Sequence, residues 1–533
     1  MKRILAATVF AMALCAIPGI ARAEDEGDDE DSKGRDHEIA EIVDEVEAER
    51  IQQSVETLEA FGTRNACSNG QGTARGVNPA RDWIFSRFSK IKSLKVALDP
   101  YIHASCPPPL NDLSKTTTFN VLAWLPGTTH PERLVVIGGH YDSRTIGVSD
   151  ATSDAPGAND SGSQSSVVLE TAKVLSQERH ANTIVFVTFS GEEQGLFGSG
   201  SIAARLASAS KAGLPAFFQG SQVVAMLNND ITGGDNYVNG PAELAKFRLY
   251  SAGTPREVGS RAPDGTPDNT SPSRGLMRYI ATFGTPYVPG FEMLPKLRND
   301  RPGRSSDQRS FTDNGIPAVR FMETVECSPS PIDNAGCTVA ANGLCTATNP
   351  SPLSLLPAAD PRRGCILGFN PGEPTSGNIA HQHSIEDKST FVTAEYSARI
   401  AKVMAATAAS LARAPIAPTF PKDSAGNFVA PAVSSTGAVT LNWQSTDRVH
   451  HFVVAARPIN ENFYRQRVAV KGKATSRAVT PAELGLPAGQ PFLISVAAVD
   501  NKGHESLFAY PEFRCDGSSC AVPAGALAIT ASK

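Results

Sequence analysis

The chain has 533 residues and a formal net charge of −5, with 49 Lys and Arg residues against 54 Asp and Glu residues. This slightly acidic balance gives no electrostatic basis for nucleic-acid binding, and the 41% hydrophobic content excludes a wholly disordered chain. With roughly 100 to 200 residues per domain, the length has room for one large core and at least one smaller module.

Residues 1–23 have the pattern of a secretory signal peptide. A basic start is followed by an apolar run over 4–20, and Ala-Arg-Ala at 21–23 has the small-x-small form of a signal-peptidase site. The alternative is an N-terminal membrane anchor, which so short an apolar run disfavours. We therefore expect a secreted or periplasmic protein, with no transmembrane segment after signal removal. Residues 24–36 are rich in Asp and Glu, and we expect a disordered acidic lead-in.

The cysteines favour disulfides. One of the nine cysteines lies in the signal peptide, and an even number remains for an exported chain. A cysteine zinc site is the alternative, but the chain has no Cys-x-x-Cys pair. Four cysteines lie in an insertion at about 326–374 that is rich in Pro, Ser, Asn and Gly, and Cys515 and Cys520 flank a tetrapeptide. Local pairing is the simplest expectation, which leaves Cys67 to pair with Cys106.

From residue 37 to residue 415, helical patterns alternate with short apolar runs. Apolar periodicity predicts helices over 39–46, 79–91, 165–176, 199–211 and 394–413. The apolar runs predict strands over 120–125, 134–137, 184–189, 223–227 and 316–321. Near-continuous apolar strands separated by helices predict an α/β domain with a mostly parallel central sheet, flanked by helices on both faces. Such sheets carry their chemistry just past the carboxyl ends of the strands.

The remaining sequence changes character after a proline-rich segment at 414–421, which predicts a domain boundary. The strands predicted in this part cover 439–443, 452–456 and 492–499. We expect a C-terminal β-sandwich over 416–514 that resembles a fibronectin type III domain, followed by a tail over 515–533. Trp443 is expected in its core rather than on a sugar-stacking surface, although contact with a surface or a polysaccharide stays a hypothesis for this part.

Acidic and imidazole side chains follow the predicted strands in order. His140 and Asp142 lie in His-Tyr-Asp-Ser, where the carboxylate can orient the imidazole for a metal. Asp160 follows in Asn-Asp-Ser-Gly, and a helix N-cap is the alternative interpretation of that residue. Glu192 and Glu193 emerge side by side from the next strand, which is costly unless a cation or a proton-transfer role compensates; a solvated turn is the alternative.

Two further donors complete the series. Asp230 ends Asn-Asn-Asp after the next strand, and His381 and His383 lie in a polar loop before the last helix. Loop histidines are usually surface residues, but as the fifth member of an ordered series His383 is the expected ligand. Five nitrogen and oxygen donors suit two zinc ions bridged by one carboxylate, with Mn or Co as alternative metals. Of the two adjacent glutamates, one should bind metal and the other should transfer a proton.

Together the motifs His-Tyr-Asp-Ser, Asn-Asp-Ser-Gly-Ser, Gly-Glu-Glu-Gln-Gly-Leu-Phe-Gly-Ser, Asn-Asn-Asp and His-x-x-x-Asp resemble the M28 family of co-catalytic zinc aminopeptidases. The resemblance covers roughly residues 37–415. The ligands that it implies are His140 and Asp230 on one zinc, Glu193 and His383 on the other, and Asp160 bridging them. It also implies that Glu192 is the general base and that Asp142 lies behind His140.

This resemblance implies hydrolysis of the N-terminal residue from peptides or proteins. The alternatives are a carboxypeptidase or dipeptidase of the same metal architecture, a glutaminyl cyclase, and a catalytically inert surface-binding protein. Two positions qualify the match. Asp387 corresponds to the family's trailing Asp, whereas Gln308 stands where family members commonly have His, which bears on substrate orientation more than on metal binding.

Overall fold

The structure is a computed structural model that describes residues 36–68, 74–102, 106, 117–145, 147–234, 243–253, 270–300, 305–324, 382–487 and 489–523. The predicted signal peptide, the lead-in up to residue 35, the insertion at 326–374 and the end of the tail lie outside these residues. His381 lies outside them as well. Within the described ranges, no helix is both long enough and apolar enough to span a bilayer.

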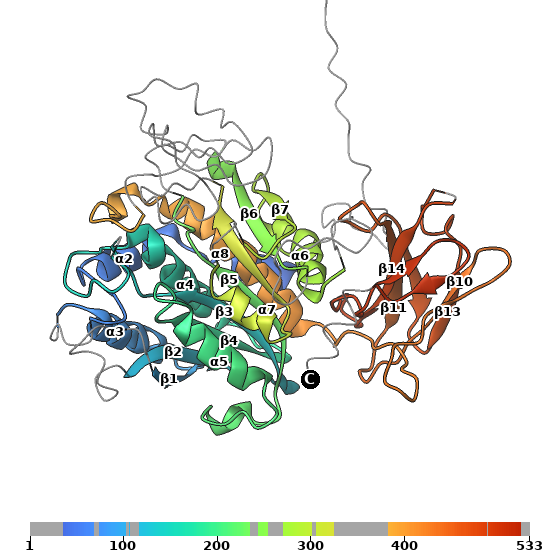
Figure 1. The fold of residues 1–533 in the computed structure, drawn as a ribbon, viewed down its shortest axis with the longest axis horizontal. Coiled ribbons are helices and arrows are strands. Elements are labelled where there is room, and N and C mark those ends of the chain that lie inside the picture. The colour runs from blue at the N-terminus through green and yellow to red at the C-terminus, as the bar shows by residue number, and fades with distance from the viewer. Residues whose placement is uncertain are drawn as a thin grey trace, which may run out of the picture.

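The elements lie in two groups along the chain (Figure 1). The helices are α1 (His37–Asp44), α2 (Ala48–Glu59), α3 (Val77–Ser89), α4 (Gln164–Leu175), α5 (Phe197–Ala207), α6 (Pro272–Phe283), α7 (Gln308–Asp313) and α8 (Ala394–Arg413). Short helical turns are η1 (Ala158–Ser163), η2 (Ala216–Phe218), η3 (Glu243–Ala245), η4 (Thr285–Tyr287) and η8 (Ser389–Phe391). The strands of the first group are β1 (Lys95–Ile102), β2 (Thr117–Leu125), β3 (His130–His140), β4 (Asn182–Phe189), β5 (Gln222–Asn229), β6 (Lys246–Ser251), β7 (Glu292–Lys296) and β8 (Ala318–Glu323).

These eight strands form one sheet in the order β1-β2-β4-β3-β5-β8-β6-β7. The central strands β4, β3, β5 and β8 are parallel to one another. By contrast, β1 with β2, β2 with β4 and β6 with β8 pair antiparallel. The sheet is therefore mixed, and the prediction of a mostly parallel sheet is correct for the central strands and for the pair of β6 with β7, but not for the other pairs. Apolar runs indicate burial on both faces but not strand direction, so the sequence pattern did not reveal the reversals.

Both faces of the sheet are covered, because successive residues of the central strands face different cores. On β3, Val135 and Ile137 belong to one buried cluster, whereas Leu134 and Val136 belong to another. Figure 1 shows α4 and α8 alongside the sheet, and both helices contribute to the first cluster. Helices α5 and α7 contribute to the second cluster. All five predicted helices and all five predicted strands of this domain are present, with shifted ends.

The missed elements had weaker signals. Strands β1 and β7 are partly exposed edge strands, and β6 carries a buried Arg248 in place of a continuous apolar run. Helix α2 is different, because Ile51, Val55 and Leu58 are buried at helical spacing. Leu276, Met277 and Ile280 of α6 are also buried at helical spacing. Both helices therefore had a usable signal in the sequence.

The C-terminal group forms two antiparallel sheets. Its strands are β9 (Ala432–Val433), β10 (Val439–Asn442), β11 (His451–Pro458), β12 (Arg467–Lys471), β13 (Ser476–Val479), β14 (Phe492–Val499), β15 (Phe513–Cys515) and β16 (Cys520–Ala521). The sheet orders are β13-β10-β9 and β12-β11-β14-β15-β16. Apolar residues of both sheets share one buried cluster that includes Trp443, which is 1% exposed. Trp443 is therefore a core residue, as predicted, and offers no surface for a sugar to stack on.

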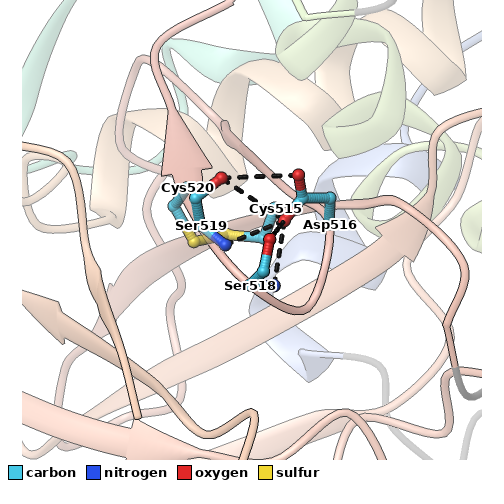
Figure 2. The surroundings of a disulfide bond; sticks show 5 residues. All are labelled: Cys515, Asp516, Ser518, Ser519 and Cys520. Atoms are coloured by element: carbon cyan, nitrogen blue, oxygen red, sulfur yellow. Dashed lines mark hydrogen bonds between the residues drawn. A yellow bond between two sulfur atoms is a disulfide. The ribbon is translucent and has the colours of Figure 1, made fainter. Parts of the chain in front are cut away.

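The predicted boundary at 514 is too early. Arg514 pairs with Ala521 and Cys515 with Cys520, so the five-stranded sheet continues into the predicted tail. A disulfide joins Cys515 to Cys520, and the carboxylate of Asp516 accepts hydrogen bonds within the turn between them (Figure 2). The other described disulfide joins Cys67 to Cys106. Both pairings agree with the sequence expectation, and the four cysteines of the insertion lie outside the described residues.

Buried ion pairs join the C-terminal sheets to the larger domain. Arg133 at the start of β3 donates two hydrogen bonds of 2.6 Å to Asp447, and the two side chains are 10% and 8% exposed. Arg278 on α6 donates to Glu512 at 2.7 Å. Because an unpaired buried charge is strongly destabilising, these pairs hold the C-terminal sheets in one position against the larger domain.

Candidate metal centre

The carboxyl ends of the central strands bring the predicted site residues together. His140 is the last residue of β3, Asp230 directly follows β5, and Glu192 and Glu193 follow β4 by three and four residues. Asp160 lies in η1, between β3 and α4. Because β3, β4 and β5 are parallel, their carboxyl ends meet at one edge of the sheet. These residues are far apart in the sequence, but their side chains therefore lie in one cluster.

Two groups of possible ligand atoms share Asp160. The first consists of His140, Asp160 and Asp230, and the second of Asp160, Glu193 and His383, each with its ligand atoms within 4.8 Å of one another. His140 Nε2 lies 3.2 Å from Asp160 Oδ1 and 3.6 Å from Asp230 Oδ1. His383 Nε2 lies 3.1 Å from Asp160 Oδ2 and 3.2 Å from Glu193 Oε2. Asp160 thus offers one oxygen to each group.

A third group consists of His140, Glu192 and Glu193, so Glu192 lies beside members of both other groups. Glu192 and Glu193 are both partly exposed as residues, whereas His140, Asp160, Asp230 and His383 are buried. Glu192 therefore adds a carboxylate that borders both groups sharing Asp160 and belongs to neither of them.

The donors fit metal ions in chemistry as well as in geometry. Glu193 Oε1 is buried and has no hydrogen-bond partner among the described residues, and Asp160 Oδ1 is buried with the imidazole of His140 3.2 Å away. Buried carboxylate oxygens normally have a hydrogen-bond partner or bind a cation. The nitrogen and oxygen donors, without a cysteine, match the ligands that zinc takes in catalytic sites.

The pKa values of the cluster residues are shifted because several carboxylates lie close to two imidazoles in a buried site. Burial opposes protonation of His140, but Glu192 and the hydrogen-bonded carboxylates outweigh it and raise the imidazole pKa well above its usual range. Burial also opposes ionisation of Asp160, yet contacts with His140 and His383 lower its pKa well below the usual value. For Glu192, desolvation dominates and raises the pKa, with Asp230 and Glu193 adding to the effect against His140.

Asp142 has a second task that the sequence analysis did not foresee. Its Oδ1 and Oδ2 accept hydrogen bonds from the backbone N–H groups of Glu192 at 3.3 Å and Glu193 at 3.2 Å. His140 Nδ1 lies 3.1 Å from the backbone carbonyl of Asp142 and 3.5 Å from its carboxylate. Asp142 therefore orients both the imidazole at the end of β3 and the paired glutamates after β4.

Asp387 and Gln382 hold Asp160 from two sides. The carboxylate of Asp387 accepts hydrogen bonds from the backbone N–H of Asn159 at 2.7 Å and of Asp160 at 2.9 Å. Gln382 Nε2 donates to Asp160 Oδ2 at 2.8 Å. Asp387, which corresponds to the trailing Asp of the family motif, thus has a structural role. It fixes the backbone at Asp160, the residue that both donor groups share.

Arg64 is a supporting residue that no sequence signal indicated. It is fully buried, and it donates hydrogen bonds to the carbonyls of Tyr141, Pro156 and Gly157 and to that of Leu58. Gly157 has a φ of 53°, a left-handed conformation that suits glycine, and this turns its carbonyl toward Arg64. One guanidinium therefore joins the loop after β3 to the turn that carries Asp160.

Asp307 is a further buried carboxyl near the cluster. It is 0% exposed, and neither of its oxygens has a hydrogen-bond partner among the described residues. Burial raises its pKa to about 7. The adjacent Gln308 donates to the backbone carbonyl of Asn299 at 3.0 Å, and its Oε1 accepts from Asn228 at 3.2 Å. Gln308 therefore connects the segments next to the site.

The cavity between the two domains is a different feature. It has a volume of about 650 Å³ and is lined by residues at the amino ends of β3 and β5, the segment after α8 and the C-terminal sheets. None of the ligand-group residues lines it. The candidate metal centre lies at the opposite ends of the same strands.

Comparisons with known proteins address the family. The sequence profile described as "Peptidase family M28" matches residues 120–408, which is more than half of the chain. A Leptosphaeria maculans protein named "Probable zinc metalloprotease" is 33% identical over 303 residues, covering 55% of this chain and 67% of that protein. One of Pyrenophora tritici-repentis with the same description is 34% identical over 305 residues, covering 55% and 60%.

The chain thus spans 60 to 67% of the length of these two relatives. The crystal structure of the Legionella pneumophila LapA aminopeptidase is 17% identical, covers 72% of this chain and 78% of that one, and has a TM-score of 0.44. That likeness is too low to bear on function. The profile match and the identity to the fungal proteins decide the family, and the chain belongs to peptidase family M28.

Proposed function

We propose that this protein is an exported aminopeptidase that uses two zinc ions to hydrolyse the N-terminal residue from peptides or proteins. The observation that carries the proposal is the pair of donor groups that share Asp160 at the carboxyl ends of β3, β4 and β5. Membership of peptidase family M28 supports the reaction class, and the names of the fungal relatives support the metal.

In this proposal, His140 and Asp230 hold one zinc, Glu193 and His383 hold the other, and Asp160 binds both. When bound, zinc ions in such sites polarise a substrate carbonyl and lower the pKa of water toward neutrality. The residues around the ligands keep them in place. Arg144 donates to Glu193 Oε2 at 2.7 Å, next to the contact of that oxygen with His383.

Glu192 is the proposed general base. Its carboxylate borders both donor groups and belongs to neither, so it remains available for proton transfer beside the proposed ligands. It would accept a proton from the attacking water and pass that proton to the leaving amine. The backbone N–H of Glu192 donates a hydrogen bond to the carboxylate of Asp142. This bond holds Glu192 beside the donor groups, and Asp142 itself is not one of the proposed ligands.

The test is a paired assay of metal content and turnover. We expect about two zinc ions per chain and release of amine from aminoacyl amides with a free α-amine, but not from their N-acetylated forms. Glu192→Gln should lower kcat by about 10²-fold or more, the range of general-base contributions, while it keeps the bound zinc. Glu56→Gln, on the exposed side of α2, is the matched control and should leave kcat unchanged.

Each alternative has its own outcome in this assay. Cleavage of substrates that have a free C-terminal carboxylate and a blocked amine would indicate a carboxypeptidase, and cleavage only of dipeptides with both ends free would indicate a dipeptidase. Release of ammonia and a cyclised product from N-terminal Gln would indicate a glutaminyl cyclase. Full zinc occupancy without turnover on any of these substrates would indicate a binding protein.

Export and the identity of the C-terminal domain are parts of the same proposal. Two described disulfides support an oxidising compartment, and two antiparallel sheets around one core support a fibronectin type III-like domain. N-terminal sequencing of the exported protein should begin at Glu24. Retention of the protein in the cytoplasm with an intact N-terminus would contradict export.

A further inference from the structure

Arg320 is a fully buried cation behind one of the proposed ligands. It lies on β8 and is 0% exposed. Its Nη2 lies 2.9 Å from Asp230 Oδ2, and its Nη1 donates to Asp300 Oδ2. A buried arginine between two carboxylates is paired on both sides. Its guanidinium is therefore held in one position and interacts with these carboxylates instead of with water.

The two carboxylate oxygens of Asp230 therefore have different surroundings. Oδ2 pairs with Arg320, whereas Oδ1 faces His140 Nε2 at 3.6 Å and accepts from Gln164 Nε2 at 3.0 Å. Only Oδ1 lies on the side of the donor group that Asp230 shares with His140 and Asp160. The carboxylate of Asp230 thus points one oxygen, Oδ1, toward His140 in the cluster and the other, Oδ2, toward Arg320 on β8.

The partner of Arg320 on its far side is held as well. Asp300 is 5% exposed, and Gln308 Nε2 lies 3.5 Å from its Oδ2 while it donates to the carbonyl of the neighbouring Asn299. A histidine at position 308 could become protonated and compete with Arg320 for Asp300. Glutamine is uncharged, so the negative charge of Asp300 stays available to Arg320.

We propose that Arg320 is a positioning residue that keeps Asp230 a one-oxygen ligand and offsets part of its negative charge. This inference rests on the zinc site proposed above. Removing the guanidinium would free the second oxygen and return the full carboxylate charge to the cluster. Both changes would strengthen the binding of a cation. Both would also make a bound zinc ion a weaker Lewis acid, so that it would polarise a substrate carbonyl less.

The proposal makes the affinity and the activity move in opposite directions. In Arg320→Met we expect zinc affinity, measured by competition with a chromophoric chelator, to rise several-fold. We expect kcat to fall by about 10- to 100-fold, the range for partners of metal ligands, with KM within about twofold. Arg320→Lys keeps a positive charge, so both quantities should return toward those of the unchanged protein.

Two variants separate this role from a general loss of packing. Arg248→Met removes another buried arginine, one on β6 that donates to the backbone carbonyl of Glu323 at the end of β8. It should lower Tm while leaving zinc affinity unchanged. Asp300→Asn removes the distant carboxylate but keeps the pair between Arg320 and Asp230, and zinc affinity should stay within about threefold.

The outcomes are distinct. Weaker or unchanged zinc binding in Arg320→Met, or an equal effect in Asp300→Asn, would overturn the proposed role. If Arg320→Met does not fold, Arg320→Lys decides the question. Its zinc affinity should lie at or slightly above that of the unchanged protein, and weaker binding there would contradict the proposal. If the unchanged protein binds no zinc, the proposed function fails first, and the measured zinc content shows which of the two has failed.

Discussion

At the scale of single residues, the candidate site is supported by side chains that are not among its donor groups. Arg64 is the clearest case, because its hydrogen bonds go to backbone carbonyls and none goes to a carboxylate. Burial lowers its pKa to about 10, so it stays charged at neutral pH. A carbonyl left without its partner in the interior costs roughly 1 to 3 kcal/mol. Arg64, from the segment after α2, is therefore one of the side chains that hold the turn carrying Asp160.

We predict that Arg64→Met lowers the free energy of unfolding by at least about 3 kcal/mol, because several buried carbonyls lose their donor at once. Urea unfolding of the metal-free protein measures this directly. Arg75→Met is the control in the same region, since Arg75 pairs with Asp154 at the surface, where the two side chains are 32% and 68% exposed. It should cost no more than about 1 kcal/mol. Equal costs for the two variants would contradict the special role of Arg64.

At the scale of elements, the two disulfides constrain loops of very different length. Cys67 and Cys106 are 39 positions apart and connect the segment after α2 to the segment after β1. Cys515 and Cys520 are 5 positions apart, and their turn is also held by hydrogen bonds to Asp516 (Figure 2). Closing a longer loop removes more conformational freedom from the unfolded chain.

The two pairs should therefore differ in what they contribute. We predict that replacing Cys67 and Cys106 by Ala lowers the free energy of unfolding by about 4 kcal/mol, and that replacing Cys515 and Cys520 lowers it by about 2 kcal/mol. Denaturant unfolding of the two double variants, compared with the unchanged protein under oxidising conditions, measures both. A larger cost for the short loop would show that chain entropy does not dominate.

At the scale of the whole molecule, a histidine joins the first helix to the C-terminal domain. His504 Nε2 lies 2.9 Å from Asp36 Oδ2 at the start of α1, and its Nδ1 lies 2.8 Å from Asp500 Oδ2. Arg413 at the end of α8 also faces Asp36, at 3.5 Å. Burial opposes protonation of His504, but the hydrogen bonds to both carboxylates outweigh it and raise the pKa above 6.5.

This arrangement sets the pH dependence of the contact. Because the folded pKa of His504 is raised, its contribution is fully present below about pH 6.5 and is lost as the pH rises through the folded pKa. The pKa values of Asp36 and Asp500 are lowered from 3.8, so their part is present above about pH 4 and is lost in stronger acid. The contact is therefore strongest in mildly acidic solution.

We predict that His504→Gln lowers the free energy of unfolding by about 1.5 kcal/mol at pH 6, the low end for bonds between charged groups since both carboxylates are partly exposed. The difference should shrink toward zero above the folded pKa. Denaturant unfolding of both proteins at pH 6 and pH 9 tests this, because comparing them at one pH cancels the titration of the metal centre. A difference that does not change with pH would refute the assignment.

The proximity of the candidate site residues was partly readable from the sequence, because His140, the paired glutamates and Asp230 each follow an apolar run that forms a strand. The carboxyl ends of parallel strands meet at one edge, so the spacing of His140, Asp160, Glu193 and Asp230 along the chain predicted their proximity. The disulfide between Cys515 and Cys520 was equally local. Helix and strand positions followed from periodicity, which records burial on one or both faces.

Only the tertiary structure decided what surrounds those residues. Arg64, Arg320 and the second task of Asp142 act through partners far away in the sequence, and no spacing rule connects such positions. The antiparallel outer strands and the extension of the C-terminal sheet beyond residue 514 depend on pairing partners, which a one-dimensional pattern does not specify. The sequence determined which acidic and imidazole groups are available for a metal centre, since their types and order are local. Their orientation, charge balance and support came from long-range packing, because those depend on distances between segments that only the folded chain brings together.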